Sequence, residues 1–96
     1  MNMHEFFEAN DRVLDFYTLA MTKAHGAHHP EVFEVRKIYQ QIEQKMRSGD
    51  SDLTKEFARL RTVTDHYTIP SDACGVYAAT YQALEQMDHL ASRHTV

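Results

Sequence analysis

The feature that most constrains this chain is its scarcity of helix-breaking residues. Three glycines and two prolines interrupt 96 residues, and they divide the chain into four segments. In each segment apolar residues recur every three or four positions, as on one face of an amphipathic helix. No segment has the strict alternation of a half-buried strand. The chain is therefore expected to be all-α.

The boundaries of the first two helices are predicted from their end signals. Asn2 and Glu5 have the spacing of a capping box at the start of the first helix. Its apolar stripe is predicted to run to Gly26 through Phe6, Val13, Tyr17, Ala20 and Ala24. The second helix is predicted to start at Pro30, with a stripe of Val32, Val35, Tyr39, Ile42 and Met46.

The last two helices follow the polar run SGDSD and Pro70. Asp50 or Ser51 is predicted to cap the third helix, whose stripe is Leu53, Phe57, Leu60, Thr64 and Tyr67. The fourth carries Ala73, Tyr77, Thr80, Leu84, Met87 and Ala91. Because the connections are short, an antiparallel up-down-up-down four-helix bundle is expected, with residues 1–96 as one domain.

Composition excludes several classes of partner. Hydrophobic residues make up 43% of the chain and the formal net charge is −4, which does not favour binding to nucleic acid. No apolar run approaches the roughly 20 residues of a membrane-spanning helix, and the start MNMHEFFE does not read as a signal peptide. The single cysteine, Cys74, excludes an internal disulfide, and we expect a cytoplasmic protein.

The chemistry-bearing residues form no familiar enzyme motif. Histidine occurs seven times, yet no H-x-x-x-H pair marks a metal site on a helix. His4 and Glu8 are four residues apart, which fits a metal-ligand pair or a solvated surface contact. Cys74 is expected in the first turn of the fourth helix, either as an activated thiol or as a structural cysteine. We expect no catalytic activity from this chain alone.

The stretch KAHGAHHPEVFEV concentrates three histidines before Pro30. It could bind a metal, or it could be a corner between two helices in which His29 caps the second helix. These readings remain open from the residues alone.

Two motifs together resemble one protein family. The first is His25-Gly26 followed by His29-Pro30-Glu31, and the second comprises Tyr67-Thr68, Pro70, Asp72-Ala73-Cys74 and Tyr77. The chain resembles the iron–sulfur cluster repair di-iron proteins (the RIC group), which are hemerythrin-like four-helix bundles linked to stress responses. The resemblance covers nearly the whole chain but only the family's hemerythrin-like domain, and it identifies His25 and His29 as parts of a corner motif.

The resemblance also implies where metal ligands lie. His4 and His94 match the ligand histidines of the family's first and last helices. The family's H-x-x-x-E pair would begin near Gly49 and its third-helix histidine would fall near Asp50, but neither is present in this sequence. A complete di-iron centre within one chain is therefore not expected.

Antiparallel packing would bring His4, Asp50 and His94 together at one end of the bundle, opposite the corner motif. We therefore predict a degenerate hemerythrin-like protein with residual iron or zinc binding by His4 and His94, helped by Asp50, Glu8 or Glu5. A homodimer is expected, in which this end of the bundle is the mating surface, and the metal would be mononuclear or shared across the dimer. The alternative is a metal-free interaction or regulatory module. Family analogy adds an iron–sulfur protein as a partner.

Overall fold

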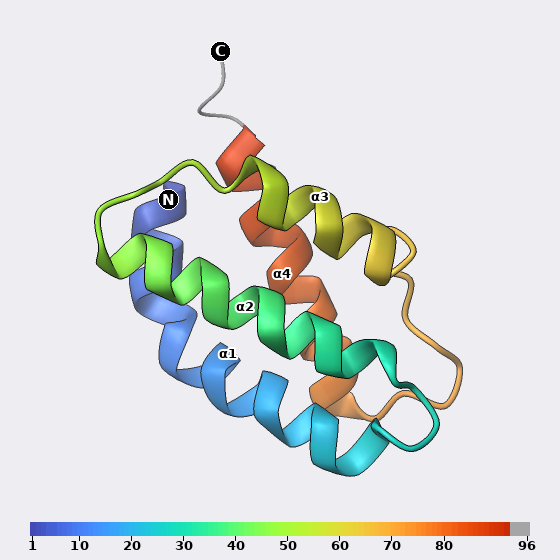
Figure 1. Cartoon of the computed structure of the whole chain (residues 1–96). Helices are drawn as coiled ribbons and strands as arrows, with labels where there is room; N and C mark the ends of the chain where they lie inside the picture. Colours follow the sequence, from blue (N-terminus) through green and yellow to red (C-terminus); the bar gives the residue numbers. More distant parts are fainter. Residues whose placement is uncertain (93–96) are drawn as a thin grey trace.

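The computed structural model describes residues 1–92, which form four α-helices and no strand (Figure 1). The helices are α1 (Met3–His25), α2 (Glu31–Arg47), α3 (Thr54–Val63) and α4 (Gly75–Ser92). The predicted all-α class is confirmed at this level. None of the helices in this part of the chain is long and apolar enough to cross a bilayer.

The predicted start and end of α1 are confirmed, and so is Phe6 of its predicted stripe, which is buried, whereas the predicted positions Val13 and Ala24 are wrong. The side chains of Asn2 and Glu5 each accept a hydrogen bond from the other's backbone N–H, which completes the capping box, and Gly26 follows the last residue. Val13 is 48% exposed and Ala24 is also exposed. The buried face consists of Met3, Phe6, Phe7, Leu14, Thr18 and Met21. Both stripes satisfy a helical period, so spacing alone could not decide which one faces the core.

The predicted face of α2 is confirmed. Pro30 directly precedes the helix, one residue before its first turn. The predicted stripe residues Val32, Val35, Tyr39 and Ile42 are fully buried, and Met46 packs against the core. This helix has only one apolar face, so its periodicity had a single solution.

The predicted limits of α3 are wrong at both ends. Neither Asp50 nor Ser51 caps it; Asp52 Oδ1 instead accepts hydrogen bonds from the backbone N–H and the hydroxyl of Thr54, at 3.3 and 2.8 Å. The helix ends at Val63, because Thr64 Oγ1 accepts a hydrogen bond from the Tyr67 backbone N–H. Side-chain bonds of this kind compete with helix continuation.

Three consecutive residues after α3 adopt the left-handed conformation. Asp65, His66 and Tyr67 have φ angles of 52, 56 and 63°, a conformation that costs non-glycine residues about 1–2 kcal/mol each. Tyr67 is held there because its buried hydroxyl donates to Asp88 Oδ2 at 2.8 Å.

The start of α4 lies later than predicted, although its stripe is confirmed. Residues 70–74 form a turn, in which the Ala73 backbone N–H donates to the Pro70 carbonyl, and the helix begins at Gly75. Ala73 therefore packs against the core from outside the helix. Within the helix the buried stripe comprises Tyr77, Thr80, Leu84 and Met87, together with Tyr81 and Asp88.

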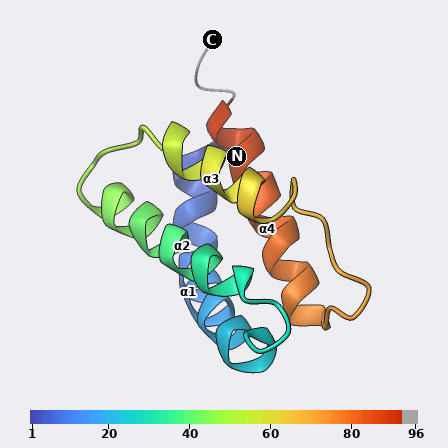
Figure 2. The same ribbon diagram turned by 45° about the vertical axis from the view of Figure 1, so that its right-hand side comes forward.

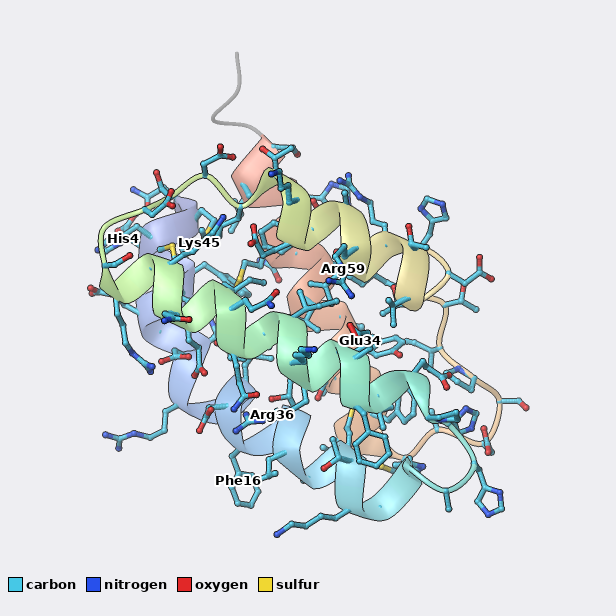
Figure 3. The ribbon with its side chains drawn as sticks, viewed as in Figure 1. His4, Phe16, Glu34, Arg36, Lys45 and Arg59 are labelled. Carbon is cyan, nitrogen blue, oxygen red and sulfur yellow. The ribbon has the colours of Figure 1, made fainter. Side chains whose placement is uncertain are left out.

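Helix α1 is the central packing element, because it contacts both α2 and α4, whereas α3 packs on α2. Figures 1 and 2 show the N-terminus, the connection between α2 and α3, and the last turns of α4 at one end of the molecule. Salt bridges from Arg59 to Glu34 (2.6 Å) and from Lys45 to Glu56 (3.1 Å) join α2 to α3 (Figure 3).

Candidate functional site

The end of the molecule that carries His4 contains a small cavity of about 280 Å³. It is lined by the start of α1, the α2–α3 connection and the end of α4, through Asn2, Met3, His4, Met46, Ser51 and Ala91. We call this region the open end. The start of α1 and the α2–α3 connection, which were assigned to the predicted metal site, therefore meet here beside the end of α4.

The predicted ligands at the open end make local contacts. His4 Nε2 lies 3.1 Å from Glu8 Oε1, with both side chains about two-thirds exposed. Asp50 Oδ1 accepts a hydrogen bond from the Asp52 backbone N–H at 3.0 Å. Within residues 1–92, no group of three or more His, Cys, Asp or Glu side chains is arranged to hold a metal ion. His94 lies outside the described residues, so the predicted site stays a prediction.

At the other end of the molecule, which we call the corner end, His25 contacts Cys74. The His25 Nε2 atom lies 3.2 Å from the Cys74 sulfur, and its ring packs edge-on against Tyr77 with centroids 5.0 Å apart. Cys74 is exposed and directly precedes α4. The expectation that it lies inside the first turn of the helix is therefore wrong, and so is the reading as a structural cysteine, which required partial burial.

His29 is the best-connected histidine of the corner end. Its Nε2 atom lies 2.9 Å from both carboxylate oxygens of Asp72, and its Nδ1 atom lies 3.3 Å from Glu31. The hydrogen bond to Asp72 raises the pKa of His29, and the same bond lowers the pKa of Asp72. No side chain caps α2, so the idea that His29 acts as its cap is wrong. His29 instead joins the α1–α2 corner to the turn before α4.

Sequence reasoning missed the His25–Cys74 and His29–Asp72 contacts. The partners are 49 and 43 residues apart, so no local spacing could pair them. Only the predicted topology could have indicated them, because an antiparallel arrangement of the helices would bring the two family-like motifs to the same end of the bundle.

A buried carboxyl group lies between α1 and α2. Glu43 is 5% exposed, and its Oε2 has no hydrogen-bond partner among the described residues. Burial raises its pKa to about 8, helped by hydrogen bonding to Asp11 and by the charges of Asp11 and Asp15. Tyr39 and Arg47 bind Asp11, at 2.7 and 2.8 Å. The neighbouring acid is thus neutralised by protein groups, while Glu43 holds a proton near neutral pH.

A second cavity, of about 440 Å³, lies between α3 and α4. Its lining includes Phe57 and Arg61 of α3 and Asp88 of α4. Asp88 Oδ2 lies 3.6 Å from the Arg61 Nε atom and also accepts the Tyr67 hydrogen bond. The cations and donors around Asp88 satisfy its charge, so the cavity offers no unpaired reactive group among these residues.

Three exposed apolar residues lie on the outward side of α1, next to the exposed Arg12. Val13, Phe16 and Leu19 follow one another at three-residue steps and are 48%, 68% and 41% exposed. We call these three residues the outward stripe. Figure 3 shows Phe16 pointing away from the other helices. The outward stripe shares only Val13 with the stripe predicted from the sequence, and it does not contribute to the core.

No protein-family model matches the chain, and no solved structure matches it significantly. The resemblance to iron–sulfur cluster repair proteins therefore rests on the two sequence motifs.

Proposed function

We propose that this chain is a helical interaction module that binds another polypeptide through the outward stripe of α1. The observation that carries the proposal is the exposure of Val13, Phe16 and Leu19 on one helix face. Single exposed apolar residues are ordinary, but three at successive turns of one helix form a patch, and exposed apolar patches mark contact surfaces. Phe16 is its anchor, because a large aromatic side chain contributes most to such interfaces.

The proposed fold is a shortened hemerythrin-like bundle with up-down-up-down topology, which is cytoplasmic and not an enzyme by itself. Its support is the meeting of the two family-like motifs at the corner end, through His25 with Cys74 and His29 with Asp72. In this proposal the corner residues hold the helices together, and binding takes place on α1.

Photo-crosslinking tests the interaction module. A photoreactive phenylalanine is placed at position 16 of the full chain, and the matched control carries it at position 33, because Phe33 of α2 is 55% exposed. We expect position 16, and not position 33, to crosslink to a polypeptide identified by mass spectrometry, whose binding to the purified chain is lost in Phe16→Ser. Equal crosslinking from both positions, or none, would contradict the module.

Residual binding of iron or zinc at the open end is the second candidate function. Two observations favour it. His4 pairs with Glu8, and His4 lines a cavity that the α2–α3 connection and the end of α4 also line. Elemental analysis of the purified, tag-free chain tests it. We expect metal bound in proportion to protein and lost in His4→Ala. A metal content below about a tenth of an equivalent per chain would contradict the metal site, and the metal-free interaction module would remain as the proposed function.

A further inference from the structure

We propose that the partner of the outward stripe is a second copy of this chain, packed with its α1 antiparallel to the first. This inference rests on the proposed interaction module and names its partner. The symmetry axis passes beside Phe16, so that the two Phe16 rings meet across it. The argument comes from the spacing of the stripe and from the charges at its two ends.

The spacing of the stripe is symmetric about Phe16. Val13 precedes it by three residues and Leu19 follows it by three. When two such helices run antiparallel with their Phe16 residues opposed, Val13 of one copy therefore lies opposite Leu19 of the other. A surface that must match itself under a two-fold rotation needs this kind of internal symmetry.

Two of the exposed charges on this face of α1, Glu8 and Lys23, are complementary in the antiparallel orientation. Glu8 lies eight residues before Phe16 and Lys23 lies seven residues after it. Antiparallel packing brings Glu8 of each copy to the level of Lys23 of the other, and the contact occurs twice. Parallel packing would instead place Glu8 against Glu8 and Lys23 against Lys23, which is unfavourable.

Both charged groups are accessible for this contact. The Glu8 side chain is 68% exposed and its salt bridge is to the equally accessible His4. Lys23 is exposed, and no salt bridge joins it to another residue of the described range 1–92. By contrast, Asp15, on the other flank of Phe16, is already bound by Arg36 at 2.9 Å.

Small residues beside the stripe allow the helices to approach. Ala9 and Ala20 lie one helical turn outside Val13 and Phe16, so the ring of Phe16 can pack beside Ala20 of the other copy. A 23-residue helix is about 34 Å long. A contact made by one such helix from each copy is small among specific interfaces, so a weak, concentration-dependent dimer is expected.

Sedimentation velocity of the purified full chain, over about 1–200 µM, tests the inference. We expect a monomer–dimer equilibrium. Its dissociation constant should rise at least about tenfold in Phe16→Ser and should be unchanged in Phe33→Ser. Glu8→Lys and Lys23→Glu should each weaken the dimer about three- to tenfold at low salt, and the double variant should restore it. Circular dichroism confirms that each variant is folded.

The possible outcomes separate this inference from the interaction module. A chain that stays monomeric at 200 µM, yet crosslinks from position 16 to another identified polypeptide, overturns the second copy and leaves the module standing. A dimer that is weakened by Phe16→Ser but not by either charge reversal overturns the antiparallel arrangement. A dimer that Phe16→Ser does not affect overturns the stripe as the interface.

Discussion

The corner end and the open end of the molecule are held together in different ways. At the corner end, His25 and His29 contact Cys74 and Asp72, which lie more than 40 residues away in the sequence. At the open end the polar contacts of His4 and Asp50 are to residues four and two positions away, and a cavity remains. The corner residues therefore join distant segments, whereas the long-range contact nearest the open end is made by Arg47 and Asp11, 36 residues apart. Substitution of the corner residues is expected to cost more stability than substitution of His4 or Asp50.

The largest expected effect at the corner end comes from Tyr77→Ala. Tyr77 is fully buried and both histidine rings pack against it, at 5.0 and 5.6 Å between ring centroids. Its removal should lower the free energy of unfolding by about 3–5 kcal/mol, measured by urea denaturation. Tyr17→Ala, at a half-buried position of α1, is the control and should cost less than about 1 kcal/mol. Equal losses would contradict the special role of the corner end.

The buried Glu43 makes the half of the molecule near the open end sensitive to pH. Its pKa is raised from 4.5 to about 8 on folding, so its contribution to stability is fully present below pH 4.5 and is lost as pH rises through 8. Over this pH window the free energy of unfolding should fall by at most about 1.4 kcal/mol per pH unit. Glu43→Gln should flatten the dependence in urea denaturation series. A slope unchanged by the substitution would show that Glu43 does not titrate in this range.

A methyl group at Gly26 tests how tightly the corner is packed. A Cβ atom there would lie 2.4 Å from the Thr22 carbonyl oxygen and 2.6 Å from the Phe33 ring. Gly26→Ala should therefore destabilise the protein by about 1–3 kcal/mol. Gly75→Ala is the matched control, because its Cβ would meet no atom within 4 Å, and thermal melting should show no loss. A neutral Gly26→Ala would mean that the corner can relax.

The left-handed turn in the connection between the two ends predicts a stabilising substitution. His66 is exposed and has a φ of 56°, so His66→Gly should raise stability by about 1 kcal/mol. The same change at His89, an exposed residue inside α4, should instead lower stability by about 1 kcal/mol. Thermal denaturation measures both, and the same sign for both would refute the strained conformation.

The smallest expected effect concerns the ion pair at the corner end. Because the pKa of His29 is raised on folding, its contribution to the free energy of unfolding is fully present below pH 6.5 and is lost as pH rises through the raised value. The contribution of Asp72 is present above pH 3.8 and is lost as pH falls through its lowered pKa. In Asp72→Asn, an NMR titration should find the pKa of His29 displaced downward. A pKa of His29 that is the same in both proteins would contradict the ion pair with Asp72.

The sequence predicts this fold where one local pattern has a single solution. The face of α2 and the capping box of α1 were predictable because apolar spacing and end residues left no alternative. The buried face of α1 was not, because Val13, Phe16 and Leu19 form a second apolar stripe beside Leu14 and Met21. The end of α3 depends on a side-chain bond from Thr64, which helical periodicity does not reveal.

The candidate site was predictable only in part, for the same reason. Sequence spacing placed His4 and the α2–α3 connection at a common end, where they line one cavity. The metal function assigned to that end stays a prediction. The contacts of Cys74 and Asp72 with the corner histidines require the tertiary structure, because each joins segments that are separated by two whole helices, α2 and α3.

The packing of α3 has a consequence for the order in which the protein opens. This helix has only ten residues, too few to persist in water without its neighbours, and its close backbone packing is with α2. Helix α1 is braced on both sides, by α2 and α4. The backbone amides of α3 should therefore exchange with deuterium through a partial opening that leaves α1, α2 and α4 assembled. Each such opening brings Phe57 and Leu60 briefly into water, making α3 the first cooperative unit of the chain to be lost.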